Sequence, residues 1–309
     1  MNRRDFIRML MATSPLLLGG CALWRDCNVC TSFLTPLSPP SVPPSEESSD
    51  DLGETQAAET RTQRELSDQL LKDDRARSDY FNHDFPEDIF YTGEKLEMLR
   101  ELTRKFRGVQ KHIGFGNFNL VGMDEFFQIA DRSPSVGAIT AREKAFLEEL
   151  FYFDAKEYGF NGDKIFPSFT VTVRINEALK IPATGHYLKK GESLDIYNRL
   201  RKDIGESLVL TSGFRAVAKQ FHLFLEKGLE SNGNISKASR SLAPPGYSFH
   251  GRGDFDVGKI GYGLKNFTQD FADTDEYKRL LDLGYIDIRY TQSNLLGVRF
   301  EPWHIKIEA

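Results

Sequence analysis

The stretch that decides the fold of this 309-residue chain is Ser248-Phe249-His250-Gly251-Arg252-Gly253-Asp254-Phe255-Asp256. A second motif, Glu301-Pro302-Trp303-His304, follows near the C-terminus and complements the first. Two histidines and a carboxylate are a common ligand set for catalytic zinc, because three protein ligands leave the fourth tetrahedral position to a water molecule. The candidate ligands are His250, Asp256 and His304. Glu301 is the candidate base that takes a proton from that water.

These residues resemble the signature of the LAS metallopeptidases, the zinc D-alanyl-D-alanine carboxypeptidase family that includes the vancomycin-resistance enzymes. That signature reads Ser-x-His-x-x-Gly-x-Ala-x-Asp, followed by Glu-x-x-His. Ser248, His250 and Gly253 match it directly, as does the pair Glu301/His304. The chain departs from this signature by one residue, because five residues lie between His250 and Asp256 where the family pattern has six.

The shortened spacing leaves two aspartates as candidates for the third ligand. Asp254 and Asp256 are two residues apart and share a face if the segment is extended. Asp256 is preferred because the following Val257-Gly258 continues the family-like run. Asp254 stays the alternative, so the sequence predicts an aspartate as the third ligand and leaves two positions open for it.

The resemblance extends back through Leu208-Val209-Leu210-Thr211-Ser212-Gly213-Phe214-Arg215 to Gln220, and so covers about the last hundred residues. It implies that Arg215 steadies an oxyanion or orients a peptide carbonyl. Without the resemblance, a surface salt bridge is the simpler interpretation of Arg215. Ser248 has two interpretations, a contact to the substrate carboxylate or local hydrogen bonds that hold its loop. Gln220 is either a second substrate contact or an ordinary helical residue.

The N-terminus carries two export signals in order. Residues 1–20 combine the twin arginine Arg3-Arg4 with an apolar stretch of signal-peptide length, and Leu18-Gly19-Gly20-Cys21 resembles a lipobox. We expect the twin-arginine export machinery as a partner and acylation of Cys21 to anchor the protein to a membrane. Ala22, rather than aspartate, follows the cysteine, and this favours sorting of the lipoprotein to the outer membrane. The sequence therefore predicts a periplasmic, lipid-anchored protein. The alternative is an apolar N-terminus with a chance cysteine.

Composition divides the remaining chain into three parts. Residues 21–85 are Pro/Ser-rich and then charged, which predicts a lipidated tether, and about sixty flexible residues reach roughly 40 to 50 Å. Residues 86–205 form a mainly helical N-terminal portion and residues 206–309 the zinc peptidase core. Cys27 and Cys30 lie in the tether, where a disulfide, a metal contact or a bystander role are the alternatives.

Hydrophobic periodicity predicts the α+β class, with the helical portion packed against a small antiparallel-sheet core that the resemblance makes LAS-like. The expected helices span 89–109, 140–158, 194–204 and 216–229, and the expected strands lie at 170–173, 208–210, 256–257, 285–289 and 298–307. In a continuous strand Glu301 and His304 would point to opposite faces. Pro302 predicts a bend between them, which allows both side chains to approach one metal.

The net charge of −5 and the absence of a dense basic run argue against a nucleic-acid partner. The resemblance implies a zinc D-alanyl-D-alanine carboxypeptidase that acts on peptidoglycan stem peptides. Two alternatives stay open: an endopeptidase that cuts crosslinks, and a noncatalytic lipoprotein that binds cell wall. The other histidines are interpreted as structural, with His186 placed where it could line a cleft.

Overall fold

The computed structural model describes residue 69 and residues 72–308. All of these belong to one compact unit, Glu54–Ala309. The predicted signal peptide, Cys21, Cys27 and Cys30 and most of the predicted tether lie outside the described residues, while residues 72–79 are helical. Within the described part of the chain, none of the helices combines the length and the apolarity that a bilayer crossing requires.

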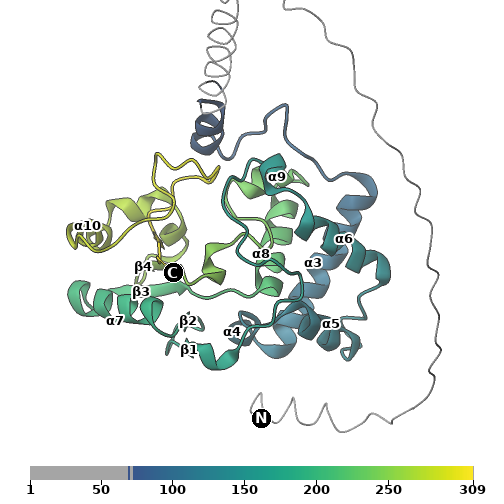
Figure 1. Cartoon of the computed structure of the whole chain (residues 1–309), viewed down its shortest axis with the longest axis horizontal. Coiled ribbons are helices and arrows are strands. Elements are labelled where there is room, and N and C mark those ends of the chain that lie inside the picture. The colour runs from purple at the N-terminus through teal and green to yellow at the C-terminus, as the bar shows by residue number, and fades with distance from the viewer. Residues whose placement is uncertain (1–68, 70–71, 309) are drawn as a thin grey trace, which may run out of the picture. The chain divides into compact units, whose positions relative to one another are not determined.

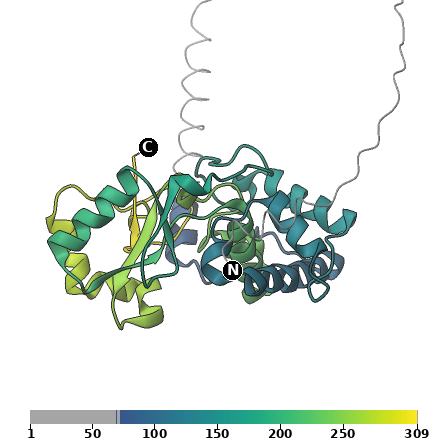
Figure 2. The same cartoon turned by 90° about the horizontal axis from the view of Figure 1, so that it is seen from below.

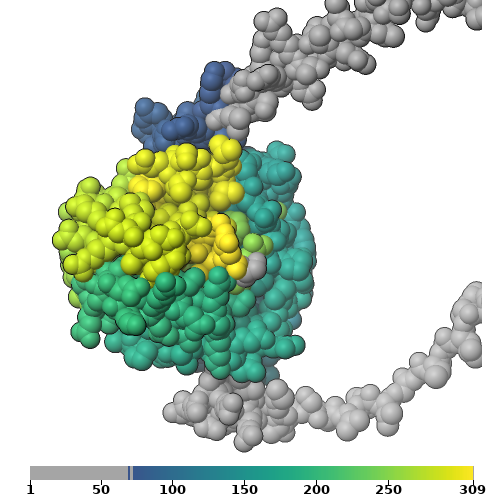
Figure 3. All heavy atoms as spheres, turned by 60° about the vertical axis from the view of Figure 1, so that its left-hand side comes forward, coloured from purple at the N-terminus to yellow at the C-terminus, as the bar shows by residue number. Residues whose placement is uncertain are grey.

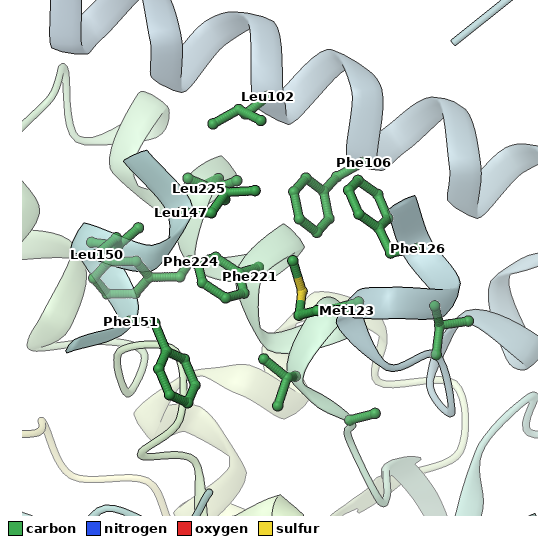
Figure 4. Packing of buried hydrophobic residues seen from close by; sticks show 14 of the residues in the cluster. Leu102, Phe106, Met123, Phe126, Leu147, Leu150, Phe151, Phe221, Phe224 and Leu225 are labelled. Carbon is green, nitrogen blue, oxygen red and sulfur yellow. The ribbon is translucent and has the colours of Figure 1, made fainter. Parts of the chain in front are cut away.

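The larger core lies among helices (Figure 1). Helix α3 (Gly93–Ile113) and helix α8 (Val217–Glu230) pack against each other, with α5 (Met123–Asp131) and α6 (Ala141–Tyr152) beside them. Apolar residues of α3 recur three or four positions apart and therefore form one buried stripe. Figure 4 shows side chains of all four helices meeting in this core: Leu102, Phe106, Met123, Phe126, Leu147, Leu150, Phe151, Phe221, Phe224 and Leu225.

A smaller core lies on an antiparallel sheet of strand order β3-β4-β5. The strands are β3 (Leu208–Ser212), β4 (Phe255–Lys259) and β5 (His304–Ile305). Helices α7 (Glu192–Ile204) and α10 (Asp275–Asp282) contribute apolar side chains to this core. Figure 2 shows the sheet on one side of the described residues and α3 on the other. The space-filling view shows the yellow C-terminal surface beside the green surface of the preceding segments (Figure 3).

Short elements connect these parts. A separate two-stranded sheet pairs β1 (Ala178–Lys180) with β2 (Tyr187–Lys189). The remaining short helices are α4 (Phe115–Phe118), η1 (Ala155–Tyr158), η2 (Ile175–Glu177), α9 (Ile235–Ser239), η3 (Phe249–Gly251), η4 (Gly263–Phe267) and η5 (Gln269–Asp273). The helices and small antiparallel sheets confirm the expected α+β class.

Several expected elements differ in the structure. Residues 170–173 form no strand: Val171 and Val173 pack against the helical core, but no neighbouring segment pairs with them. The expected strand at 285–289 is reduced to a single bridge between Ile288 and Ile305. The expected strand at 298–307 is reduced to β5, because a turn at Pro302 interrupts it.

Helix α6 also ends earlier than the periodicity predicts. Phe153 is extended, and the Asp154 side chain accepts a hydrogen bond from Lys156 N at the start of η1. Local capping thus divides the expected helix 140–158 in two.

Elements from both sides of the predicted boundary at residues 205/206 share each core. Helix α7, from the predicted helical portion, packs against the sheet, whereas α8, from the predicted peptidase core, packs into the helical core. Both sides of the predicted boundary therefore contribute to both hydrophobic cores.

Candidate metal centre and catalytic site

A cavity of about 390 Å³ lies where α8 approaches the sheet. His250, Asp256 and His304 line it together with Glu301 and Arg215. The cavity thus gathers the candidate ligands, the candidate base and the candidate oxyanion contact, which the sequence separates by up to 89 positions (304 − 215). A volume of this size is within the range of small-ligand sites.

The sheet register brings the ligand candidates together. Asp256 in β4 pairs directly with His304 in β5, and His250 lies in η3 just before β4. Opposed residues of antiparallel strands present their side chains on the same face. One ligand atom from each of the three residues lies within 4.8 Å of the others, and all three residues are buried.

These distances fit a tetrahedral zinc ion. Asp256 Oδ1 lies 3.4 Å from His250 Nε2 and 3.2 Å from His304 Nδ1. Zinc bonds of about 2.0–2.1 Å place tetrahedral ligand atoms about 3.3–3.4 Å apart. Asp256 Oδ1 is also buried without a hydrogen-bond donor, which is a costly arrangement unless another cation occupies the site. The donor set and these two distances therefore suit zinc.

Both imidazoles are oriented by contacts on the side away from the convergence point. His250 Nδ1 donates to the carbonyl oxygen of Gly213 over 2.9 Å, and His304 Nε2 donates to Asp254 Oδ2 over 3.0 Å. Such contacts fix the tautomer and leave the other ring nitrogen for the metal. A Cβ at Gly213 would lie 2.1 Å from the carbonyl oxygen of Tyr187. Glycine is therefore needed at position 213, whose own carbonyl contacts His250.

Asp254 is fully occupied by other donors. Arg289 donates to both of its carboxylate oxygens, over 2.7 and 3.0 Å, and Ile307 N donates to Oδ1 over 2.9 Å. With His304 on Oδ2, each oxygen accepts two hydrogen bonds. The geometry favours Asp256 as the ligand and assigns Asp254 to holding His304, and this assignment stays a prediction that metal analysis can test.

Electrostatics around His304 favour a cation. Burial lowers the pKa of this imidazole, but the hydrogen bond to Asp254 and the nearby carboxylates of Asp256 and Glu301 outweigh burial and raise the pKa well above its usual value. Burial raises the pKa of Asp256, but the nearby imidazoles of His250 and His304 hold it well below its usual range. The carboxylates therefore stabilise positive charge where the ligand atoms converge.

Glu301 lies beside the ligands without a short contact to any of them. Its Oε2 lies 3.7 Å from His304 Nδ1, and its Oε1 lies 3.7 Å from Arg299 Nε, both longer than hydrogen bonds. A turn at Pro302, in which His304 N donates to the Glu301 carbonyl, places both side chains on the cavity. The bend expected at Pro302 is therefore present, and the Glu301 carboxylate is available to a substrate or water.

Arg215 lies between β3 and α8 and faces the cavity. Its Nη2 donates to Asp256 Oδ2 over 3.0 Å, and Nε and Nη2 both donate to Ser212 Oγ. The guanidinium thus orients the second oxygen of the proposed ligand. Because Arg215 also lines the cavity, its charge acts where an oxyanion would develop.

The two expected substrate contacts differ in position. Ser248 lines the cavity at the start of η3. Gln220 is buried in α8, and its Nε2 donates to the carbonyl oxygen of Ala243 over 2.5 Å. Ala243 lines the cavity, whereas Gln220 lies behind it. The structure therefore places Gln220 in support of the cavity wall.

Sequence reasoning missed several residues of the site. Tyr290 lines the cavity with its ring 4.8 Å from that of His304, and Arg289 holds Asp254. Lys219 was also missed and lines the cavity beyond Arg215, whereas His186, which was placed where it could line a cleft, does line it. The one local signal for Lys219 was its position directly before Gln220. No local signal indicated Tyr290 or Arg289, because their contacts depend on long-range packing.

Part of the chain is similar to known proteins. Residues 192–308 match the model of the VanY family, described as D-alanyl-D-alanine carboxypeptidase. A variant of the vancomycin-resistance D,D-pentapeptidase VanY, solved in complex with Zn(II), is 23% identical over 42% of this chain and 77% of that chain, with a TM-score of 0.33. The LD-carboxypeptidase LdcB is 24% identical over 47% of this chain and 65% of that chain, also with a TM-score of 0.33. No curated protein matches the chain significantly.

The family match begins at α7, earlier than the segment from Leu208 on which the motif resemblance depended. It confirms that resemblance, and with it the expected class of enzyme, a metallopeptidase. Zinc, the expected cofactor, is the metal in the VanY structure, and His250, Asp256 and His304 form a possible site for it here. The match to the VanY family model, described as D-alanyl-D-alanine carboxypeptidase, therefore covers residues 192–308, which carry all three candidate ligands.

Proposed function

We propose that the protein is a zinc-dependent D-alanyl-D-alanine carboxypeptidase that removes the terminal D-alanine from peptidoglycan stem peptides. The observation that carries the proposal is the convergence of His250, Asp256 and His304 beside Glu301 in one cavity. The family match of residues 192–308 supports the same chemistry. A noncatalytic cell-wall protein would have no need of a carboxylate that lies beside a metal group without binding the metal.

Each side chain has a defined part in this reaction. Zinc, when bound, supplies a Lewis acid that polarises the scissile carbonyl and lowers the pKa of water. Glu301 accepts the proton of the attacking water and delivers it to the leaving amine. Arg215 stabilises the negative charge that develops on the carbonyl oxygen. Ser248 provides a hydroxyl on the cavity wall for the substrate.

Removal of the metal tests this chemistry directly. We expect the purified protein to release D-alanine from a synthetic stem pentapeptide that ends in D-alanyl-D-alanine, to stop after treatment with a chelator, and to recover with added zinc. Released D-alanine and bound zinc would be measured on the same samples. Full activity in metal-free protein would overturn the proposal, and a product cut inside the peptide would indicate an endopeptidase.

We further propose that the protein is exported by the twin-arginine machinery and anchored through Cys21 to the outer membrane, facing the periplasm. The order of Arg3-Arg4, the apolar stretch and Cys21 supports this proposal. A lipid-anchored enzyme on a tether would meet its peptidoglycan substrate in that compartment.

Replacement of Cys21 by alanine is expected to abolish lipidation and release exported protein from membranes, because the acyl chains supply the anchoring free energy. Replacement of Arg3 and Arg4 by lysine is expected to block export. Both effects are measured by fractionation and by incorporation of labelled fatty acid. Unchanged membrane attachment of the Cys21→Ala variant would contradict the lipoprotein proposal.

A further inference from the structure

The cavity extends from the metal group along one face of α8. Lys219, Leu223, Glu226, Lys227 and Glu230 line it at helical spacing, whereas Phe221, Phe224 and Leu225 on the opposite side enter the helical core. The same helix thus fixes the fold and presents charged groups to a bound peptide.

Lys219 differs from the other charged residues of this wall in its partner. Its Nζ donates to Gln110 Oε1 of α3 over 2.8 Å, a neutral amide that positions the ammonium without neutralising it. Among the described residues, no carboxylate forms an ion pair with Lys219. Burial and the charge of Arg215 lower the pKa of Lys219 to about 8 against the opposing effect of Glu226, so Lys219 is mostly protonated at neutral pH.

The acidic residues of the wall are engaged by other cations. Glu226 pairs with Arg107 over 2.8 Å, and Glu230 pairs with Lys227 over 3.2 Å. Asp256 accepts from Arg215 over 3.0 Å. These pairs leave the ammonium of Lys219 as a positive charge that faces the cavity and has no anionic partner in the described part of the chain.

Lys219 lines the same cavity as the metal group. His186 lines the same wall, where the charges of Arg215, Asp256, Lys219 and His250 act on its ring. Burial and Arg215 lower the pKa of His186 to about 4, so its ring is neutral at neutral pH and does not compete for an anion. A substrate carboxylate on this wall would therefore find the cations Arg215, which is bound to Asp256, and Lys219, which forms no ion pair among the described residues.

We propose that Lys219, positioned by Gln110, binds a carboxylate of the substrate peptide and makes the enzyme selective for peptides that carry this charge. This inference rests on the proposed peptidase function and adds a specificity-determining residue to it. The terminal carboxylate of the leaving alanine and an internal carboxylate of the stem peptide offer the same chemistry. A hydrogen bond between charged partners corresponds to about 10- to 100-fold in the specificity constant.

The test compares peptides that differ only in one carboxylate. A stem pentapeptide is assayed as the free acid, with an amidated C-terminus, and with its internal carboxylate amidated. We expect Lys219→Met to lower kcat/KM for the free acid about 10- to 100-fold, mainly through KM, and to leave unchanged the peptide whose relevant carboxylate is already amidated. The peptide that is insensitive to the substitution identifies the carboxylate.

Two further variants separate charge from structure. Gln110→Glu keeps the shape of its side chain but gives Lys219 an anionic partner, and is expected to weaken cleavage of the free acid in the same direction. Lys219→Arg is expected to retain most of the preference. Lys111→Met, which removes an exposed lysine one position after Gln110, is the matched control and should change none of the rates.

Equal losses on all three peptides, or an unchanged preference in Lys219→Met, would overturn the inference. If the parent protein cleaves no peptide, the proposed function fails, but the inference is still tested by calorimetric binding of the three peptides to zinc-loaded parent and Lys219→Met proteins. Weaker binding of the free acid to the variant supports a role for Lys219 in recognition, and identical binding rejects it.

Discussion

Replacement of Glu301 by glutamine is expected to remove peptide hydrolysis while the protein keeps its fold and its zinc. The amide preserves the shape of the side chain but cannot accept the proton of the attacking water. General acid–base assistance contributes about 100- to 10,000-fold, so kcat should fall by at least that order. Rates on peptides ending in D-alanyl-D-alanine provide the measurement.

Metal content and circular dichroism of the same samples provide the control. Glu301 lies 3.7 Å from His304 Nδ1 and makes no hydrogen bond to the proposed ligands, so neither quantity should change appreciably. A folded, zinc-loaded Glu301→Gln protein that cleaves as fast as the parent would show that another group is the base. Loss of zinc from this variant would instead make Glu301 part of the metal site.

The second large effect is expected at Asp256, where substitution by asparagine should weaken zinc binding more than about 100-fold. A residue that holds a ligand from outside the metal shell typically contributes 10- to 100-fold, and Asp254→Asn should fall within that range. The pair is well matched, because both side chains are buried and each accepts hydrogen bonds from an arginine. Zinc titration against a competing chelator compares them.

Asp254→Asn is also expected to unfold more readily than the parent, because Arg289 loses its charged partner in a buried setting. Thermal unfolding of both variants would reveal this difference. Complete loss of zinc in Asp254→Asn together with full retention in Asp256→Asn would reverse the assignment and place the ligand at Asp254.

The metal group could be predicted from sequence because it depends on short motifs. His250 and Asp256 lie within seven residues, counting both, and Glu301 and His304 flank one bend, so local spacing carries most of the information. The spacing could not separate Asp254 from Asp256. What separates them is Arg289, 35 positions from Asp254, and the backbone of Ile307, 53 positions away, and no local pattern encodes such contacts.

The strand predicted at residues 170–173 was wrong for a related reason. Alternating threonine and valine predicts burial on one side, and Val171 and Val173 are indeed partly buried against the helical core. A strand also needs a neighbour to pair with, and the pattern does not specify one. The contact between Lys219 and Gln110 spans 109 positions and was equally invisible, although it gives α3 a part in the site.

Mass spectrometry of purified muropeptides incubated with the zinc-loaded protein tests the central claim most directly. We expect pentapeptide-containing species to lose one terminal alanine, with crosslinked species losing an alanine only from free pentapeptide ends and keeping their crosslinks, and no change with the Glu301→Gln protein. Unaltered muropeptides after incubation with folded, zinc-loaded parent protein would contradict the claim.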